Sequence, residues 1–167
     1  GNGGGDTITA GDGNDQLEAG NPGASLMDGG NGDDRLLGGD DDDVLRGGNG
    51  DDILIARLGH DQMTGGAGTN HYVPGLDETN GLCDRDLVIG SDGGYDIVYF
   101  SNPSNQYTRS NPCNQGSCRI SRNDLGDRKV VDVSGGNRLI FAGNGQEQEQ
   151  IELAEGDAAP LPPLEDA

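Results

Sequence analysis

A nine-residue repeat dominates the N-terminal half of this 167-residue chain and limits the folds that are open to it. Residues 29–64 read GGNGDDRLL, GGDDDDVLR, GGNGDDILI and ARLGHDQMT, which are four consecutive blocks without a gap. Each block has Asp at its sixth place and an apolar residue at its eighth place. Because a unit of this length cannot bury an apolar side chain by itself, the blocks must stack on one another.

The same register continues on both sides of this array. Two upstream blocks keep both the Asp and the apolar place. The third block, residues 19–27, has Ala24 in place of Asp, and Asp28 is then interpreted as a one-residue insertion. The last block has Asn70 at the Asp place. The sequence therefore predicts eight blocks over residues 1–73.

Each block has room for one short strand and one turn. The last three residues predict a strand whose central side chain points inward, and the six residues before it predict a Gly-rich turn. Two blocks then make one coil, so the inward side chains fall into two columns, one for each sheet of the roll. The first predicted column is Ile8, Leu26, Leu45 and Met63, and the second is Leu17, Leu36, Leu54 and Tyr72.

The pattern G-G-x-G-x-D-x-U-x, in which U is a large apolar residue, resembles the calcium-binding repeat of the RTX (repeats-in-toxin, haemolysin-type) family. The resemblance implies an all-β fold, a right-handed parallel β-roll of nonapeptide repeats. It also implies several bound Ca²⁺ ions, a secreted, extracellular location and the type I export machinery as a partner. Such repeats are carried by type I secreted proteases, lipases, epimerases, toxins and adhesins.

The turns have the chemistry that calcium requires. Glycine permits positive φ and lets carbonyl oxygens approach one point, and Ca²⁺ takes about 6–8 hard oxygen ligands. By the resemblance, each ion lies between turns on the same edge of the roll, hence between alternate blocks. The predicted side-chain ligands are Asp6, Asp15, Asp34, Asp43, Asp52, Asp61 and Asn70. The turn residues predicted to complete the metal sites are Gly29, Asn31, Gly32, Gly38, Asp40, Gly47, Asn49 and Gly50.

Carboxylate pairing ranks the predicted sites. Three strong sites are expected where two carboxylates face each other, at the pairs 15/34, 34/52 and 43/61. Weaker sites are expected where one carboxylate is missing, at the pairs 52/70, 6/24 and 24/43. A single acidic, Gly-rich block is more often a solvated or disordered loop. Eight blocks that share one phase favour the repeat instead.

The composition is close to that of disordered chains. The net charge is −20, only 31% of the residues are hydrophobic and Trp is absent, so calcium is expected to supply part of the stability. The lack of a basic patch argues against nucleic acid or an anionic membrane as a partner. No stretch is apolar over the length of a membrane span, and no N-terminal signal peptide is recognisable.

The remainder of the chain is expected to cover the end of the roll. The last coil of a stacked roll exposes strand edges and apolar side chains. Residues 74–157 are interpreted as this C-terminal β-rich cap, and residues 158–167 as an acidic, Pro-rich tail. Residues 91–99 fit equally a ninth, degenerate repeat and an ordinary strand after a turn. Strands are predicted at residues 97–100, 119–121, 130–133 and 139–141.

The other reactive residues form no strong motif. Cys113 and Cys118 enclose a short polar loop, so a disulfide and two free thiols are equally open, and Cys83 is left over. His60 and His71 fall at turn and strand-flank places, where solvated side chains are expected. Serine hydrolase and zinc protease motifs are missing from the sequence, so this segment is not predicted to be an enzyme, whereas its parent protein could be one.

Two functions are compatible with these features. One is a calcium-responsive module that is disordered at the low calcium of the cytosol and folds outside the cell, which supports export and stability. The other is a module that binds carbohydrate or a cell surface for a secreted enzyme or adhesin. The first is favoured because the only aromatic residue of the repeats, Tyr72, falls at an inward place. Since the chain begins inside a repeat, it is expected to be part of a larger protein.

Overall fold

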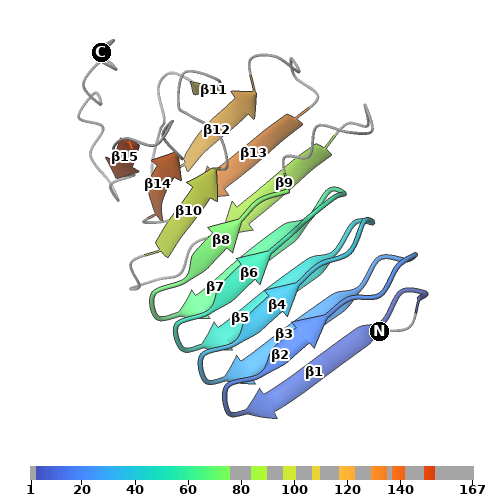
Figure 1. The fold of residues 1–167 in the computed structure, drawn as a ribbon. Helices are drawn as coiled ribbons and strands as arrows, with labels where there is room; N and C mark the ends of the chain where they lie inside the picture. Colours follow the sequence, from blue (N-terminus) through green and yellow to red (C-terminus); the bar gives the residue numbers. More distant parts are fainter. Residues whose placement is uncertain are drawn as a thin grey trace.

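The computed structural model describes residues 3–75, 84–89, 96–100, 107–109, 117–122, 129–134, 137–141 and 149–152. In this part of the chain every regular element is a β-strand, and the strands form two sheets (Figure 1). Within the repeats, consecutive strands alternate between the sheets, so each pair of strands makes one coil of a β-solenoid. The predicted all-β, parallel β-roll is confirmed.

The two sheets of the roll differ in strand length. The longer strands are β1 (Thr7–Asp12), β3 (Leu26–Asn31), β5 (Val44–Asn49) and β7 (Gln62–Ala67). The three-residue strands are β2 (Gln16–Glu18), β4 (Arg35–Leu37), β6 (Ile53–Ile55) and β8 (His71–Val73). Neighbouring strands in both sets are parallel. Each six-residue strand runs into the Gly-rich turn that follows it, which places the turn backbone in register with the next coil.

Two columns of buried side chains fill the space between the sheets. The second predicted column is confirmed, because its members are buried and in register: Leu17, Leu36, Leu54 and Tyr72. In the first column the register runs from Ile8 through Met27 to Leu45. Met27 is fully buried, so it occupies the place that was predicted for Leu26. The prediction for Leu26 is wrong by one residue.

The extra residue of the third block lies in its turn and not at Asp28. Asp28 pairs with Thr9 and with Arg46, so it is part of the strand ladder. Ser25, and not Ala24, takes the Asp place, because its carbonyl accepts a hydrogen bond from the next coil at 2.8 Å, as that of Asp6 does. A turn can absorb an inserted residue, whereas a strand would shift its side chains to the wrong face.

Two further strands continue the roll. β9 (Asp84–Ile89) is parallel to β7, and β10 (Asp96–Phe100) is parallel to β8. Val88 and Val98 are fully buried and extend the two columns by one member each. The backbone N–H of Ile97 donates to the carbonyl oxygen of Asn70 at 2.7 Å. Asn70 stands at the Asp place of the preceding coil, so this bond matches those between the repeats. Both interpretations of residues 91–99 stay open, because β9 makes the same bond without the repeat pattern and residues 91–95 lie outside the described residues.

Beyond β9 and β10, each sheet gains one more parallel strand, β13 or β14, and then antiparallel strands. The longer-stranded sheet continues through β13 (Lys129–Ser134), β12 (Ser117–Arg122) and β11 (Tyr107–Arg109). The other sheet continues through β14 (Asn137–Phe141) and β15 (Glu149–Glu152). The four strands predicted in this half of the chain are confirmed as parts of β10, β12, β13 and β14. The boundary at residue 73 and the role of residues 74–157 as a cap stay predictions.

Glycine is required where neighbouring turns stack most closely. Gly30, Gly48 and Gly66 have φ angles of 110°, 120° and 93°, in the region that favours glycine. A Cβ on Gly48 would collide with the carbonyl oxygen of Gly30, and a Cβ on Gly66 with that of Gly48. The repeated glycines therefore let the turns stack at the spacing of the strands.

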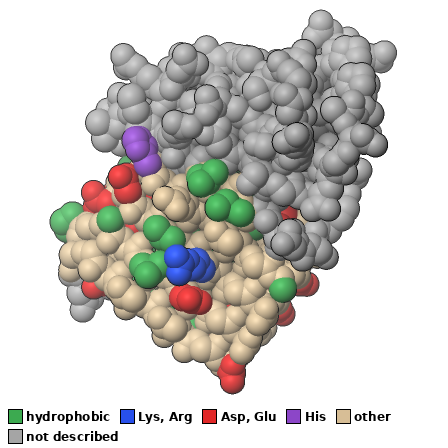
Figure 2. All heavy atoms as spheres, turned by 180° about the vertical axis from the view of Figure 1, so that it is seen from behind, with side chains coloured by type: hydrophobic (Ala, Val, Ile, Leu, Met, Phe, Trp, Pro, Cys, Tyr) green, Lys and Arg blue, Asp and Glu red, His purple; other side chains and the backbone are tan. Residues whose placement is uncertain are grey.

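The surface of the roll carries only scattered apolar side chains. Figure 2 shows one face, on which hydrophobic side chains lie among a few charged ones. Among the described residues, Ile53 and Ile89 are the exposed large hydrophobic side chains. Isolated apolar side chains of this kind are ordinary on protein surfaces. No helix in the described part of the chain is long and apolar enough to cross a membrane.

Candidate metal centre

The predicted ligands line up along two edges of the roll. We call the turns that lead into β2, β4, β6 and β8 the first edge, and the turns that lead into β1, β3, β5 and β7 the second edge. The first edge carries, at the Asp place, Asp15, Asp34, Asp52 and Asn70. The second edge carries Asp6, Ser25, Asp43 and Asp61. The predicted grouping is reproduced, apart from Ser25 at the place expected for Ala24.

On the first edge, one side-chain oxygen of Asp34, Asp52 and Asn70 joins neighbouring coils. The N–H of Asp15 donates to Oδ1 of Asp34 at 2.8 Å, and the N–H of Asp34 donates to Oδ1 of Asp52 at 2.8 Å. The N–H of Asp52 donates to Oδ1 of Asn70 at 3.0 Å. These bonds satisfy buried backbone donors. Oδ1 is therefore part of the framework, whereas Oδ2 of Asp34 and of Asp52 takes no part in it.

The second oxygens of Asp34 and Asp52 are buried and make no hydrogen bond. Oδ2 of Asp6 on the second edge shares this property. Burial raises the pKa of Asp52 from its ordinary value of 3.8 to about 6, and the nearby carboxylate of Asp34 adds to this rise. A buried carboxylate without a partner is costly. These oxygens therefore fit a cation.

Glycine leaves a gap beside Oδ2 of Asp34 and beside Oδ2 of Asp52. A Cβ on Gly29 would collide with Oδ2 of Asp34 and would lie 2.7 Å from the carbonyl oxygen of Gly47. A Cβ on Gly47 would collide with Oδ2 of Asp52 and would lie 2.7 Å from the carbonyl oxygen of Gly65. We call these gaps the first and the second cradle. Each joins a carboxylate oxygen to a carbonyl oxygen of the next coil, which is the hard oxygen set that Ca²⁺ prefers.

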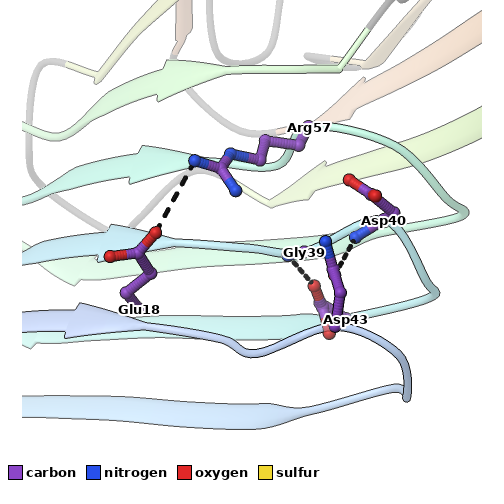
Figure 3. Close-up of polar contacts among 6 residues, drawn as sticks. Glu18, Gly39, Asp40, Asp43 and Arg57 are labelled. Carbon is purple, nitrogen blue, oxygen red and sulfur yellow. Dashed lines mark hydrogen bonds and ion pairs between the residues drawn. The ribbon is translucent and has the colours of Figure 1, made fainter. Parts of the chain in front are cut away.

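The second edge is less open. Oδ2 of Asp43 already accepts a hydrogen bond from the N–H of Gly39 at 2.5 Å (Figure 3). A Cβ on Gly38 would lie 3.0 Å from this oxygen and would collide with the carbonyl oxygen of Ala56. Ser25 has no second oxygen, and its Oγ accepts only a long hydrogen bond from the N–H of Asp6, at 3.4 Å. Asp43 and Ser25 are thus less available to a cation than Asp34 and Asp52, whereas Oδ2 of Asp6 makes no hydrogen bond.

The first place of each block includes Gly29, Gly38 and Gly47, which the sequence predicted as part of the metal sites, but the contrast between Gly and Ala at this place was not predicted. On the first edge, this place is held by Ala10 in the first block and by Gly29, Gly47 and Gly65 in the three that follow. On the second edge, buried Ala19 and Ala56 stand there, with Gly38 between them in the block of Asp43. The difference between Gly and Ala is visible in the sequence. Its effect on a metal site becomes clear only from the structure, in which the carboxylate at the sixth place of a block faces the residue at the first place.

The other predicted turn residues serve the stacking of coils. The carbonyls of Asn31 and Asn49 accept hydrogen bonds from the N–H groups of Gly13 and Gly32, both at 2.7 Å. Their side chains form a ladder in which Nδ2 of Asn49 donates to Oδ1 of Asn31 at 2.7 Å. A carbonyl oxygen has two lone pairs, so each can still serve an ion. Gly50 has positive φ, at 131°.

Asp40 lies on the exposed side of the second edge. Its N–H donates to Oδ1 of Asn21 at 2.8 Å (Figure 3). Arg57, which follows β6, approaches Glu18 at the end of β2, along the stack of coils, with an N–O distance of 3.7 Å. Both of these side chains are largely exposed, and such ion pairs contribute little to stability. This ion pair therefore does not replace a metal ion.

Histidine and cysteine do not contribute to the cradles. The ring of His71 stacks on that of Tyr99 with 5.6 Å between centroids, and the backbone N–H of exposed His60 donates to Asp42 at 2.8 Å. The possible disulfide between Cys113 and Cys118 lies outside the described residues. In the described part of the chain, no three His, Cys, Asp or Glu side chains gather around one point. An ion in the cradles would draw on backbone carbonyls as well.

The comparison with known families agrees with this geometry. The RTX calcium-binding nonapeptide repeat matches the chain in four copies, at residues 1–21, 19–45, 28–63 and 37–72. Residues 1–72 belong to the RTX calcium-binding repeat family. The RTX repeats make this part of the chain a calcium-binding module, and a roll of this kind is structural and not catalytic. No curated protein matches the chain.

Proposed function

We propose that the RTX roll of this protein binds several calcium ions and that binding drives its folding. The observation that carries the proposal is the pair of buried Oδ2 atoms of Asp34 and Asp52, which have no hydrogen-bond partner and face glycine gaps. Without a cation these charges oppose folding, because burial in a poor solvent for ions is unfavourable. A bound cation reverses this effect.

The cradles of the first edge are the strongest sites in this proposal. Oδ2 of Asp34 with the carbonyl of Gly47 forms one, and Oδ2 of Asp52 with the carbonyl of Gly65 forms the other. Asp43 with the carbonyl of Ala56 provides a third, weaker site. Asp15, Asp6 and the remaining predicted turn residues contribute further oxygens where neighbouring turns face each other.

The proposal extends to the place where the module works. Extracellular calcium modules bind at about 10⁻⁴–10⁻³ M, which lies above cytosolic and near external calcium levels. A module of this kind would stay unfolded during type I export and would fold after release from the cell. The secreted location and the export machinery as a partner rest on the family resemblance. The activity of the parent protein is a separate question.

Calorimetry on two isosteric variants tests the proposal. Asp34→Asn keeps the Oδ1 acceptor for Asp15 and replaces only Oδ2 by an amide, whereas Asp33→Asn makes the same change of charge at an exposed neighbour. We expect Asp34→Asn to lose at least one calcium ion or about tenfold in affinity, and Asp33→Asn to bind nearly as the unchanged protein does. Equal losses in both variants would show that calcium responds to net charge and not to the cradle.

A carbohydrate-binding function is the second candidate from the sequence. A glycan array probed with the calcium-loaded protein would raise it above a purely structural role if it gave saturable binding to one class of glycan.

A further inference from the structure

The series of cradles ends at Gly65, where the protein fills the gap with its own groups. A Cβ on Gly65 would collide with Nδ2 of Asn70 and with the hydroxyl oxygen of Tyr72. In the two preceding coils, a carboxylate oxygen and a carbonyl oxygen lie at the corresponding places. The acceptor pair that suits a cation is thus replaced by an amide donor and a hydroxyl.

Hydrogen bonds hold the hydroxyl of Tyr72 in this position. The N–H of Gly65 donates to it at 2.8 Å, and the hydroxyl donates to the carbonyl oxygen of Ile89 at 3.2 Å. Tyr72 is completely buried, and burial raises the pKa of its phenol, so the group stays a neutral donor. Three strands, β7, β8 and β9, are joined by this one oxygen.

Asn70 completes the network. Its Oδ1 accepts from the N–H of Asp52 at 3.0 Å and so keeps the ladder of the first edge. Its Nδ2 donates to the carbonyl oxygen of Gly66 at 3.3 Å, and its backbone N–H donates to Oδ1 of Asp96, the first residue of β10, at 2.9 Å. An amide NH₂ at the place of Oδ2 presents hydrogen atoms, which repel a cation.

We propose that the Tyr72 hydroxyl and the Asn70 amide form a plug that takes the place of a calcium ion and holds β7 and β8 to β9 and β10 in the absence of metal. The proposal rests on the proposed function, because the plug is defined by contrast with cradles that take calcium. Ordinary core packing would explain the aromatic ring of Tyr72. It would not explain why the hydroxyl occupies the position of a metal-facing oxygen.

Amide hydrogen exchange on the full chain in EGTA tests the plug directly. We expect the amides of Gly65 and Asn70 to be protected in EGTA, whereas those of Asp34 and Asp52 exchange rapidly until calcium is added. Tyr72→Phe, which keeps the ring, should lower the protection of Gly65 about 5–10-fold, the effect of one lost hydrogen bond. Rapid exchange of Gly65 and Asn70 in EGTA, or unchanged protection in Tyr72→Phe, would overturn the plug.

A gain-of-site variant provides a second readout. Asn70→Asp combined with Tyr72→Leu restores a carboxylate and removes the hydroxyl, so calorimetry should count one more calcium ion than in the unchanged protein. Tyr72→Phe alone should add none, because the amide remains. An unchanged count in a folded double variant would contradict the plug. If the unchanged protein bound no calcium at all, the proposed function would fail, whereas the protection of Gly65 in EGTA would still decide the plug.

Discussion

The two edges of the roll carry the same nonapeptide, yet they offer a cation different surroundings. On the first edge, Gly29 and Gly47 leave open the space beside Oδ2 of Asp34 and Asp52. On the second edge, Gly38 faces Oδ2 of Asp43, but this oxygen accepts a hydrogen bond from the N–H of Gly39, and Ala56 stands at the first place of the next block on that edge. A metal site in this roll thus depends on a missing side chain as much as on a carboxylate.

The largest effect is expected when the first edge is made to resemble the second. Gly47→Ala would drive a methyl group against Oδ2 of Asp52 and toward the carbonyl oxygen of Gly65. Crowding of this kind typically costs about 1–3 kcal/mol, and here it also fills a cradle. We expect the calcium concentration at half-maximal folding, followed by circular dichroism, to rise more than tenfold. If Gly47→Ala folded at the same calcium concentration as the unchanged protein, the glycine at the first place would not be what distinguishes the two edges.

A smaller difference is expected between two Asp→Ala changes on opposite edges. Asp34→Ala removes a fully enclosed carboxylate, the acceptor for Asp15 and a ligand of the first cradle. Asp6→Ala removes a half-buried carboxylate whose neighbour in the next coil is Ser25. Calorimetry should therefore find the greater loss of calcium affinity for Asp34→Ala. Equal losses would mean that both edges bind the ion alike.

The next effect is a pH dependence of calcium binding on the first edge, which comes from Asp52. The pKa of Asp52 is raised to about 6 in the fold, so the folded state holds a proton that the unfolded chain has released between pH 3.8 and 6. The metal-free fold should lose stability as pH rises through this window. Calcium needs the ionised group, so its affinity for the second cradle should fall about tenfold from pH 7 to pH 5. Calorimetry at both pH values checks this, and Asp52→Asn should lack this part of the change.

The smallest effect is expected from opening the second edge. Ala56→Gly removes the methyl group at the first place of its block, but it also gives the unfolded chain more freedom, which costs about 0.4–1 kcal/mol. We expect a slightly less stable roll that gains calcium affinity by a few-fold. A calorimetric titration that showed weaker binding would indicate that the alanine supports the second edge and does not restrict it.

The sequence predicted the roll well because a periodic pattern repeats each signal many times. The second column from Leu17 to Tyr72 and the first-edge register were read correctly from the spacing of Asp and apolar residues. The prediction for the third block was wrong, because its Pro-containing turn accommodates an inserted residue and the spacing alone does not locate that residue. Met27 and Ser25 were misplaced for this reason.

The features that the sequence did not predict depend on contacts between coils. β9 lacks the glycines of the repeat, so the stacking of Val88 on Met63 had no signal in the pattern. The two oxygens of each Asp are equivalent in a sequence, and only the fold assigns one to the ladder and the other to the cradle. The hydroxyl of Tyr72 reaches the gap at Gly65 from another strand, a contact that no local motif records.

Small-angle scattering together with circular dichroism tests the central claim most directly. The full chain should be measured in EGTA, in millimolar calcium and in millimolar magnesium. Mg²⁺ is a demanding control, because it prefers strict octahedral geometry and gives up its water reluctantly. We predict an expanded chain with little β-structure over the cradles in EGTA and in magnesium, and a compact, β-rich roll in calcium. A compact, β-rich form of the whole roll in EGTA, or equal folding in magnesium, would contradict calcium-driven folding.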